Sequence, residues 1–140
     1  MANPAYRRAI VKVSGECLLG VDGASIDQSM LARIAADIAA AHKAGTQIGV
    51  VIGGGNIFRG VKVSAQGIPR QTGDSMGMLA TVMNALALEV AIEQAGVAAR
   101  TLSALAMPQL CETYERRQAV RHLDGGRVVL LAGGTANPFF

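Results

Sequence analysis

Three glycine-bearing turns, each directly after an apolar segment, are the best candidates in this chain for binding an anion. They are Ser14-Gly15, Gly53-Gly54-Gly55 and Gly133-Gly134. Because glycine has no Cβ, a ligand can approach the backbone closely, and successive N–H groups can then form an anion-binding concavity. Any single glycine here is equally consistent with a simple turn. Three consecutive glycines favour phosphate binding.

Lys12 is the most informative charged residue, since it lies within the apolar segment Ala9–Val13, just before the turn Ser14-Gly15. A lysine there is costly unless a partner or an anionic ligand meets it. The alternative is a lysine whose ammonium group reaches solvent at the edge of a sheet. Arg59, just after the triple glycine, could contact a phosphate through two nitrogens. An ordinary surface arginine is the alternative there.

Asp74 stands at the start of a long apolar segment, where the N–H groups of a helix N-terminus favour a carboxylate. Helix capping and acceptance of hydrogen bonds from a ribose are both open for it. Two common phosphate motifs are excluded. Val21 and Val61 occupy the lysine position of G-x-x-x-x-G-K-[ST], and Phe58 occupies the last glycine position of G-x-G-x-x-G.

The elements that position these residues alternate between strand and helix patterns. Short apolar, β-branched runs predict strands over Ala9–Val13, Gln47–Ile52, Val97–Ala104 and Arg127–Ala132. Helical spacing predicts a helix capped by Ser25 or Asp27 and ended by Gly45, a helix over Asp74–Ala95, and a helix over Tyr114–Leu123. This order predicts an α/β fold in which a mostly parallel sheet is sandwiched between helices. Ligands then bind beyond the carboxyl ends of the strands, where the glycine turns should meet.

Two apolar stripes identify the expected core faces of the first two helices. The first stripe is Leu31, Ile34 and Ile38, and the second is Met76, Leu79, Met83, Leu86 and Val90. The polar stretch Gly60–Gly73 between the second strand and the second helix predicts a loop.

Composition narrows the class of protein. A chain of 140 residues with 51% hydrophobic and 16% charged residues predicts one globular domain rather than disorder. The basic residues behind the net charge of +3 are scattered, so nucleic acid is not expected as a partner. Met76–Ile92 contains Asn84 and Glu89 and is too short and polar to predict a membrane span.

The cysteines and histidines give no sign of a disulfide or a metal site. Cys17 and Cys111 are far apart, and no signal peptide is recognised, which favours a reduced cytoplasmic location. His42 and His122 lack ligand-like spacing, so no protein-bound metal is predicted.

Four blocks, in this order along the chain, resemble bacterial UMP kinases, which belong to the amino-acid-kinase fold family. The blocks are Lys12–Glu16, Val51–Gly60, Gly73–Asn84 and Gly134–Phe140. Carbamate, acetylglutamate and aspartate kinases share the first two blocks in looser form. The block containing Asp74 and the run Asn137-Pro-Phe-Phe140 point to UMP kinases. The resemblance covers the whole chain.

The resemblance implies transfer of the γ-phosphoryl group of Mg²⁺-ATP to UMP, giving UDP in pyrimidine nucleotide biosynthesis. It implies catalytic roles for Lys12 and Arg59, and an ATP side formed by Lys12, Val13, Ser14, Gly15, Gly55 and Arg59. The UMP side would be formed by Gly54, Asp74, Thr135, Ala136, Asn137, Pro138, Phe139 and Phe140. Activation by GTP would involve the loop Gly20, Val21, Asp22, Gly23, Ala24 and Ser25. Inhibition by UTP and a homo-hexamer are further implications.

Members of this family continue well beyond the position of Phe140, so residues 1–140 are expected to be the amino-terminal, UMP-binding part of the domain without its carboxy-terminal half. We expect such a chain to expose an unpaired edge at the strand Arg127–Ala132 or its neighbour, to self-associate, and to lack measurable activity alone. Two other interpretations stay open. One is a sibling kinase acting on a carboxylate or carbamate, and the other is a non-catalytic nucleotide-binding or assembly module.

Overall fold

The structure is a computed structural model that describes residues 4–58 and 67–134. Its strands are β1 (Arg8–Val13), β2 (Gln47–Ile52), β3 (Ala99–Ser103), β4 (Glu112–Thr113) and β5 (Val128–Ala132). Its helices are the 3₁₀ helix η1 (Gly15–Leu18) and the α-helices α1 (Gln28–Lys43), α2 (Gly55–Phe58), α3 (Arg70–Gln94) and α4 (Arg116–Asp124).

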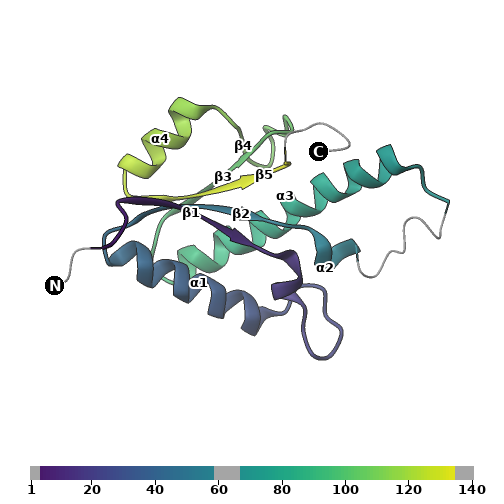
Figure 1. The fold of residues 1–140 in the computed structure, drawn as a ribbon, viewed down its shortest axis with the longest axis horizontal. Helices are drawn as coiled ribbons and strands as arrows, with labels where there is room; N and C mark the ends of the chain where they lie inside the picture. The colour runs from purple at the N-terminus through teal and green to yellow at the C-terminus, as the bar shows by residue number, and fades with distance from the viewer. Residues whose placement is uncertain (1–3, 59–66, 135–140) are drawn as a thin grey trace.

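The five strands form one sheet in the order β1-β2-β5-β3-β4, and every pairing between them is parallel (Figure 1). Helices α1 and α3 lie together against one face, whereas α4 lies against the other. Side chains of strand β5 pack on both faces of the sheet. Val128 and Leu130 belong to the large core under α1 and α3, whereas Val129 packs with Leu123 of α4. The predicted α/β sandwich with a parallel sheet is confirmed.

Helix α1 begins at the cap that the sequence predicted, with Asp27 rather than Ser25 in that role. The Asp27 carboxylate accepts hydrogen bonds from the Ser29 hydroxyl at 2.6 Å and from the Met30 backbone N–H at 3.0 Å. These bonds, the one from Ser29 most of all, hold the pKa of the Asp27 carboxyl below its ordinary value of 3.8. A carboxylate at this position satisfies an N–H group that has no partner within the helix.

The apolar stripe of α1 faces the core as predicted. Leu31 and Ile38 are buried, and the half-buried Ile34 packs against the same cluster. The chain leaves the helix through Gly45, whose φ of +113° lies in the left-handed region that favours glycine.

Helix α3 begins earlier than predicted, at Arg70 instead of Asp74, so the expected loop Gly60–Gly73 is wrong over its last residues. The cap is Pro69, which makes no side-chain capping bond. Asp74 therefore does not cap the helix. It lies in the second turn, with its carboxylate 3.8 Å from Arg70 Nε.

The stripe predicted to be the core face of α3 is largely on the outer face. Leu79, Met83 and Val90 are 44, 55 and 52% exposed, and Met76 and Leu86 are half-buried. The residues that are buried are Ala80, Val82, Asn84, Ala85, Leu88, Ala91 and Ile92. Three of them are alanine, and Ala80 lies where α3 approaches the Gly54 backbone closely. At that close approach the available space limits the size of the buried side chain, which a hydrophobicity pattern alone does not indicate.

Three short elements, η1, α2 and β4, were not predicted. They contain two to four residues each, which is too few for a periodic pattern to appear. For β3, α4 and β5, the observed ends differ from the predicted ends by two residues or fewer.

The expected unpaired edge at Arg127–Ala132 is wrong. Strand β5 lies in the middle of the sheet, between β2 and β3, and neither of those neighbours is an edge. Within the described part of the chain, the edges are β1 and β4.

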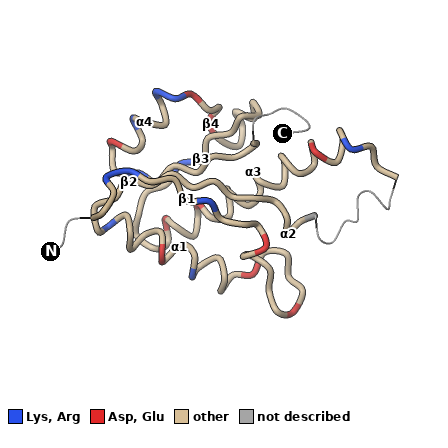
Figure 2. Tube along the Cα trace, in the orientation of Figure 1, with Lys and Arg blue, Asp and Glu red and all other residues tan. Residues whose placement is uncertain are grey.

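Charged residues of both signs are distributed over several elements (Figure 2). Among the described residues, α3 alone is long and apolar enough to cross a membrane by length and composition. Its contacts with α1, β3 and β5 are those of the core helix of a globular protein.

The cap of α1 predicts a pH-dependent contribution to stability. Asp27→Ala should lower the thermal unfolding temperature at pH 7, because the Met30 N–H loses its acceptor. The native pKa of Asp27 is lowered, so its contribution is present above the unfolded pKa, about 3.9, and is lost as the pH falls through the native value. Circular dichroism melts between pH 7 and pH 2 should show the two proteins converging in acid. Asp37→Ala, at an exposed position of the same helix, is the control. An equal loss in both variants would contradict the capping role.

Candidate active site

The three glycine turns lie side by side, as the sequence predicted. Strands β1, β2 and β5 are consecutive in the sheet and parallel, so their carboxyl ends point the same way. The turns begin at Ser14, Gly53 and Gly133. This edge is where parallel α/β sheets bind ligands.

Close packing between backbone segments explains why two positions in these turns must be glycine. A Cβ atom on Gly15 would lie 2.6 Å from the Gly53 carbonyl oxygen and 2.8 Å from the Gly55 nitrogen. A Cβ atom on Gly54 would lie 2.8 Å from the Cβ of Ala80 in α3. Real Cβ atoms do not make such contacts, so a larger residue would separate the two turns from each other or from α3.

A pair of buried amides fixes the turn after β2 to α3. Asn84 Nδ2 donates to Asn56 Oδ1 and to the Gly53 carbonyl oxygen, both at 2.7 Å. In return, Asn56 Nδ2 donates to Asn84 Oδ1 at 3.0 Å and to the Ser25 carbonyl oxygen at 2.9 Å. Both side chains are at most 1% exposed. A buried amide is tolerated when it is hydrogen-bonded, and these two bond each other and two neighbouring segments.

Helix α3 also holds the turn after β5. The Gly133 N–H donates to the Thr81 hydroxyl at 2.8 Å, and that hydroxyl donates to the Met78 carbonyl oxygen at 2.7 Å. Gly133 and Gly134 have φ values of +83° and +57°, so this turn requires a residue tolerant of the left-handed region. One helix therefore positions two of the three turns through polar side chains one turn apart.

A pocket of about 560 Å³ opens at this end of the sheet. It is lined by Lys12, Val51, Ile52, Gly53, Thr81, Leu102, Ala104, Tyr114, Leu131, Ala132 and Gly134. Four of these residues are in register across the sheet, because Lys12 pairs with Val51, Val51 with Leu131 and Leu131 with Leu102. Side chains opposite one another in neighbouring strands share a face, so Lys12 is at the end of a row whose other members are apolar.

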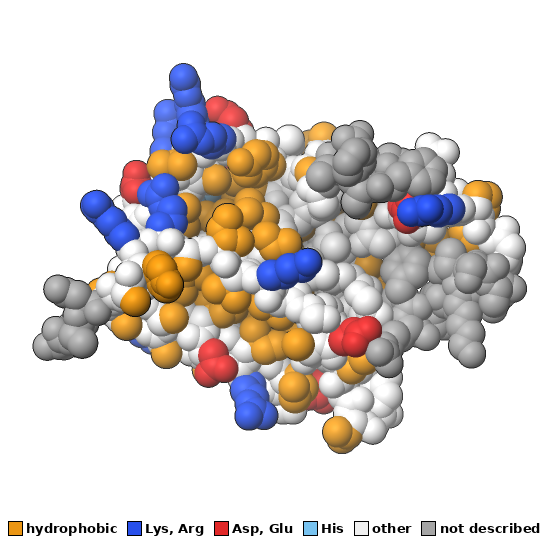
Figure 3. All heavy atoms as spheres, viewed as in Figure 1, with side chains coloured by type: hydrophobic (Ala, Val, Ile, Leu, Met, Phe, Trp, Pro, Cys, Tyr) orange, Lys and Arg blue, Asp and Glu red, His pale blue; other side chains and the backbone are white. Residues whose placement is uncertain are grey.

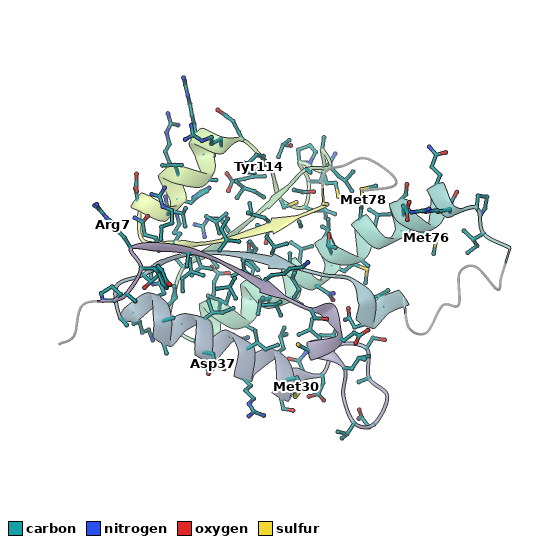
Figure 4. The ribbon with its side chains drawn as sticks, viewed as in Figure 1. Arg7, Met30, Asp37, Met76, Met78 and Tyr114 are labelled. Atoms are coloured by element: carbon teal, nitrogen blue, oxygen red, sulfur yellow. The ribbon has the colours of Figure 1, made fainter. Side chains whose placement is uncertain are left out.

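Lys12 is the one charged residue among the lining residues that the structure describes. It is exposed, since it lies on the edge strand β1, and a cation next to apolar walls favours an anionic ligand. On another side of the pocket is Tyr114, which is labelled in Figure 4 and is 48% exposed. Its backbone N–H donates to the Ser103 carbonyl oxygen at 2.7 Å, which fixes the chain there.

The residues expected on the ATP side are close together where they are described. Ser14 caps η1, with its hydroxyl accepting from the Glu16 N–H at 3.3 Å, and Gly15 packs on the Gly53–Gly55 turn. Val13, the last residue of β1, is half-buried against the core under α1 and α3. Arg59 lies outside the described residues.

The residues expected on the UMP side are more dispersed. Gly54 lies against α3 beside the pocket, whereas Asp74 is nearly two helical turns before Thr81 and does not line it. The run 135–140, which carries the other predicted UMP contacts, lies outside the described residues. Gly134, the last residue that the structure describes, lines the pocket.

The loop predicted to respond to GTP is a compact turn next to the amide pair. The Gly20 N–H donates to the Ala24 carbonyl oxygen at 2.8 Å, and Asp22 Oδ1 accepts from the Ala24 N–H at 3.2 Å. Val21 at its tip is fully exposed. Ser25 ends the loop and accepts the bond from Asn56, so loop and glycine turn are joined directly.

Sequence reasoning assigned no role to Asn56, Thr81, Asn84 or Tyr114. Asn56 and Asn84 stand within two of the blocks used for the resemblance. A polar residue within an otherwise apolar helix, as Asn84 is, was the signal available for it. Its partner is 28 positions away, and no local pattern indicates such a pairing.

Magnesium in kinases is usually held by one or two carboxylates together with substrate phosphates. None of the residues that line the pocket is a carboxylate, and no group of three or more His, Cys, Asp or Glu side chains able to hold a metal occurs in the described ranges. The described lining of this pocket therefore supplies no carboxylate ligand for magnesium.

Residues 7–138 match the model of the amino acid kinase family. The chain belongs to this family. The match extends over nearly the whole chain and includes every element described above, from β1 to β5.

Curated relatives of this amino acid kinase family chain include uridylate kinases from Rhodopseudomonas palustris strain BisB18 and Nitrobacter hamburgensis. They are 61% and 59% identical to it over 140 residues. The alignment covers the whole chain but 59% of each relative, so the chain spans about three-fifths of the length of the curated relatives it matches.

Two solved structures have the same fold as this amino acid kinase family chain. The UMP kinase of Bacillus anthracis superposes with a TM-score of 0.91 at 35% identity, covering 96% of this chain and 56% of that one. The UMP kinase of Ureaplasma parvum superposes with a TM-score of 0.90 at 31% identity, covering 98% of this chain and 58% of that one.

The amide pair predicts a large effect of one substitution. Asn84→Leu should lower the free energy of unfolding by roughly 2–6 kcal/mol, because at least two buried groups, the Gly53 carbonyl and Asn56 Oδ1, lose a partner at ~1–3 kcal/mol each. Urea unfolding measures the change.

Thr101→Val is the matched control, since it also replaces a buried polar residue by an apolar one of similar size. The Thr101 hydroxyl is buried without a hydrogen-bond partner among the described residues. This variant should be neutral or stabilising. Equal losses in the two variants would show that the amide pair contributes nothing specific.

Proposed function

We propose that this chain carries the glycine turns and the catalytic lysine of a UMP kinase, which transfers the γ-phosphoryl group of Mg²⁺-ATP to UMP and releases UDP. The position of Lys12 is the main support. Lys12 lines, together with Gly53 and Gly134, a pocket that has no other charged lining residue among those described. The relatives named uridylate kinase support the same substrate.

Phosphoryl transfer requires only groups of the kind that line this pocket. The attacking atom is an oxygen of the UMP phosphate, which is already anionic and needs no general base. The protein's part is to align two anions and to balance charge on the transferred group, which a lysine and fixed backbone N–H groups can do. Mg²⁺ is proposed to arrive with ATP and to neutralise its phosphates.

We assign roles to the individual residues of the glycine turns and their neighbours. We propose that Lys12 and Arg59 stabilise the transferred group, and that Val13, Ser14, Gly15 and Gly55 contact ATP. Gly54, Asp74 and residues 135–140 are proposed to contact UMP. Asp74 does not line the pocket of the described residues, so its contact would be made from the amino-terminal part of α3, beyond Thr81.

We also propose that nucleotides regulate the protein and that it forms a homo-oligomer. GTP is proposed as activator through residues 20–25 and UTP as inhibitor. The bond between Ser25 and Asn56 supports a connection from that loop to the glycine turn. A homo-oligomer, with the hexamer as its expected form, is supported by the exposed apolar side chains Leu79, Met83 and Val90 on α3. We place the protein in the cytoplasm and in pyrimidine nucleotide biosynthesis.

One assay separates this proposal from its two alternatives. The chain is extended at its carboxyl end with the remaining part of the R. palustris uridylate kinase and incubated with γ-labelled ATP. UMP, carbamate or N-acetylglutamate is then added in separate reactions. Label in UDP alone supports the proposal. Label transferred to carbamate or N-acetylglutamate identifies a sibling kinase, and no transfer to any of them identifies a non-catalytic module.

Lys12→Met tests the central role in the same extended protein. Phosphoryl transfer should fall by ~10²–10³, the scale for loss of one donor that stabilises transition-state charge. UMP binding, measured by calorimetry, should change little, because the lysine acts on the transferred group. Lys43→Met is the control, since the Lys43 ammonium group donates to the Ala95 carbonyl oxygen and does not line the pocket. Near-normal turnover in Lys12→Met would exclude the assigned role.

A further inference from the structure

One row of side chains crosses the whole sheet beneath the pocket and carries a charge at each end. In the order of the strands it consists of Lys12, Val51, Leu131, Leu102 and Glu112. The three middle residues are apolar and line the pocket, as Lys12 does. Figure 3 shows apolar side chains gathered over the middle of the sheet in this view. Because side chains opposite one another share a face, the row forms an apolar floor between β1 and β4.

Tyr114 lies at the β4 end of this floor. It follows Glu112 by two positions, and its backbone N–H extends the pairing of β4 with β3 by donating to the Ser103 carbonyl oxygen at 2.7 Å. Residues two apart along a strand share a face, so Tyr114 lies on the same face as the row. It lines the pocket and is 48% exposed, so nearly half of it is open to a ligand.

A buried histidine holds β4 in place. His122 of α4 is 7% exposed, and its Nε2 lies 3.0 Å from both carboxylate oxygens of Glu112. Arg127 Nε donates to His122 Nδ1 at 2.9 Å, which places the histidine proton on Nε2, where it is donated to Glu112. These bonds join the segment before β5 to α4 and β4. Since β4 has two residues and few ladder bonds of its own, this anchor fixes the position from which Tyr114 starts.

The two ends of the floor suit the two ends of a nucleoside monophosphate. Lys12 favours an anionic group, whereas Tyr114 offers an aromatic ring to a flat base. Of the two nucleotides in the proposed reaction, UMP fits this direction. The ATP side was assigned to Ser14 and Gly15 after β1, on the other side of the sheet from β4. Gly134, which immediately precedes the run proposed to contact UMP, lines the pocket between these ends.

We propose that Tyr114 contacts the base of UMP by stacking its ring on the uracil, and that Glu112 and His122 hold it in position for this contact. The inference rests on the proposed function and deepens it. The glycine turns supply backbone N–H groups, which bind phosphate and make no contact with the flat face of a base. Stacking on an aromatic ring is possible for every base, so Tyr114 supplies affinity for a base and does not select uracil.

Calorimetry on the extended protein tests the contact. Tyr114→Ala should weaken UMP binding by roughly five- to 150-fold, the range for replacing a stacking aromatic residue by alanine. Tyr114→Phe keeps the ring and should retain most of the affinity. ATP affinity should be unchanged in both variants, which also shows that they are folded. Tyr6→Ala is the matched control, because Tyr6 is 71% exposed and does not line the pocket.

Ribose 5-phosphate identifies the part of UMP that Tyr114 contacts. It has the sugar and phosphate of UMP but no base, so its inhibition constant should be the same in Tyr114→Ala and the unsubstituted protein. Glu112→Ala should also weaken UMP binding, whereas Glu112→Gln should restore it, because the amide oxygen still accepts from His122 Nε2. Once Tyr114 is replaced by alanine, neither change at Glu112 should alter UMP binding further.

Three results would overturn the inference: unchanged UMP affinity in Tyr114→Ala, an equal loss in Tyr6→Ala, or an equal loss for ribose 5-phosphate. An effect of Glu112→Ala that is the same with and without the Tyr114 ring would overturn the positioning role. If the unsubstituted protein binds UMP and transfers phosphate to it, these results leave the proposed function intact. If it binds no UMP, the proposed function and this inference fail together.

Discussion

The reciprocal hydrogen bonds between Asn56 and Asn84 are the constraint on which the geometry of this site depends. They join the segment after β2 to α3, and through Ser25 they reach the loop before α1. The same helix, one turn earlier, holds Gly133 through Thr81. Two of the turns that border the pocket are thus fixed to one rigid element. Lys12 reaches the same place from β1, in register with Val51.

Much of the fold could be predicted because it rests on patterns within one segment. The bounds of β2 were predicted without error, since Gln47–Ile52 is a continuous apolar run that ends at three glycines. The start of α1 was predicted because Asp27 has the chemistry of a cap. The glycine turns converge because parallel strands place their carboxyl ends at one edge, which is a rule of topology.

What could not be predicted depends on contacts between distant segments. The outward face of α3 carries the apolar side chains Leu79, Met83 and Val90, whereas Ala80 is buried, because the space next to the Gly54 backbone is small. A hydrophobicity pattern measures apolar character and cannot measure that space. Likewise, the edge position of β1 depends on strand order, and the partnership of Asn84 with Asn56 depends on how α3 crosses β2.

The central position of β5 has a consequence for the order of events during synthesis on the ribosome. Strands β2 and β3 are never neighbours, and each needs Val128–Ala132 between them. The first hundred or so residues to leave the ribosome therefore contain β1–β2 as one pair and β3 without its central neighbour. The sheet becomes continuous when the last described strand emerges, so the nascent chain must keep two apolar edges apart from other chains until then.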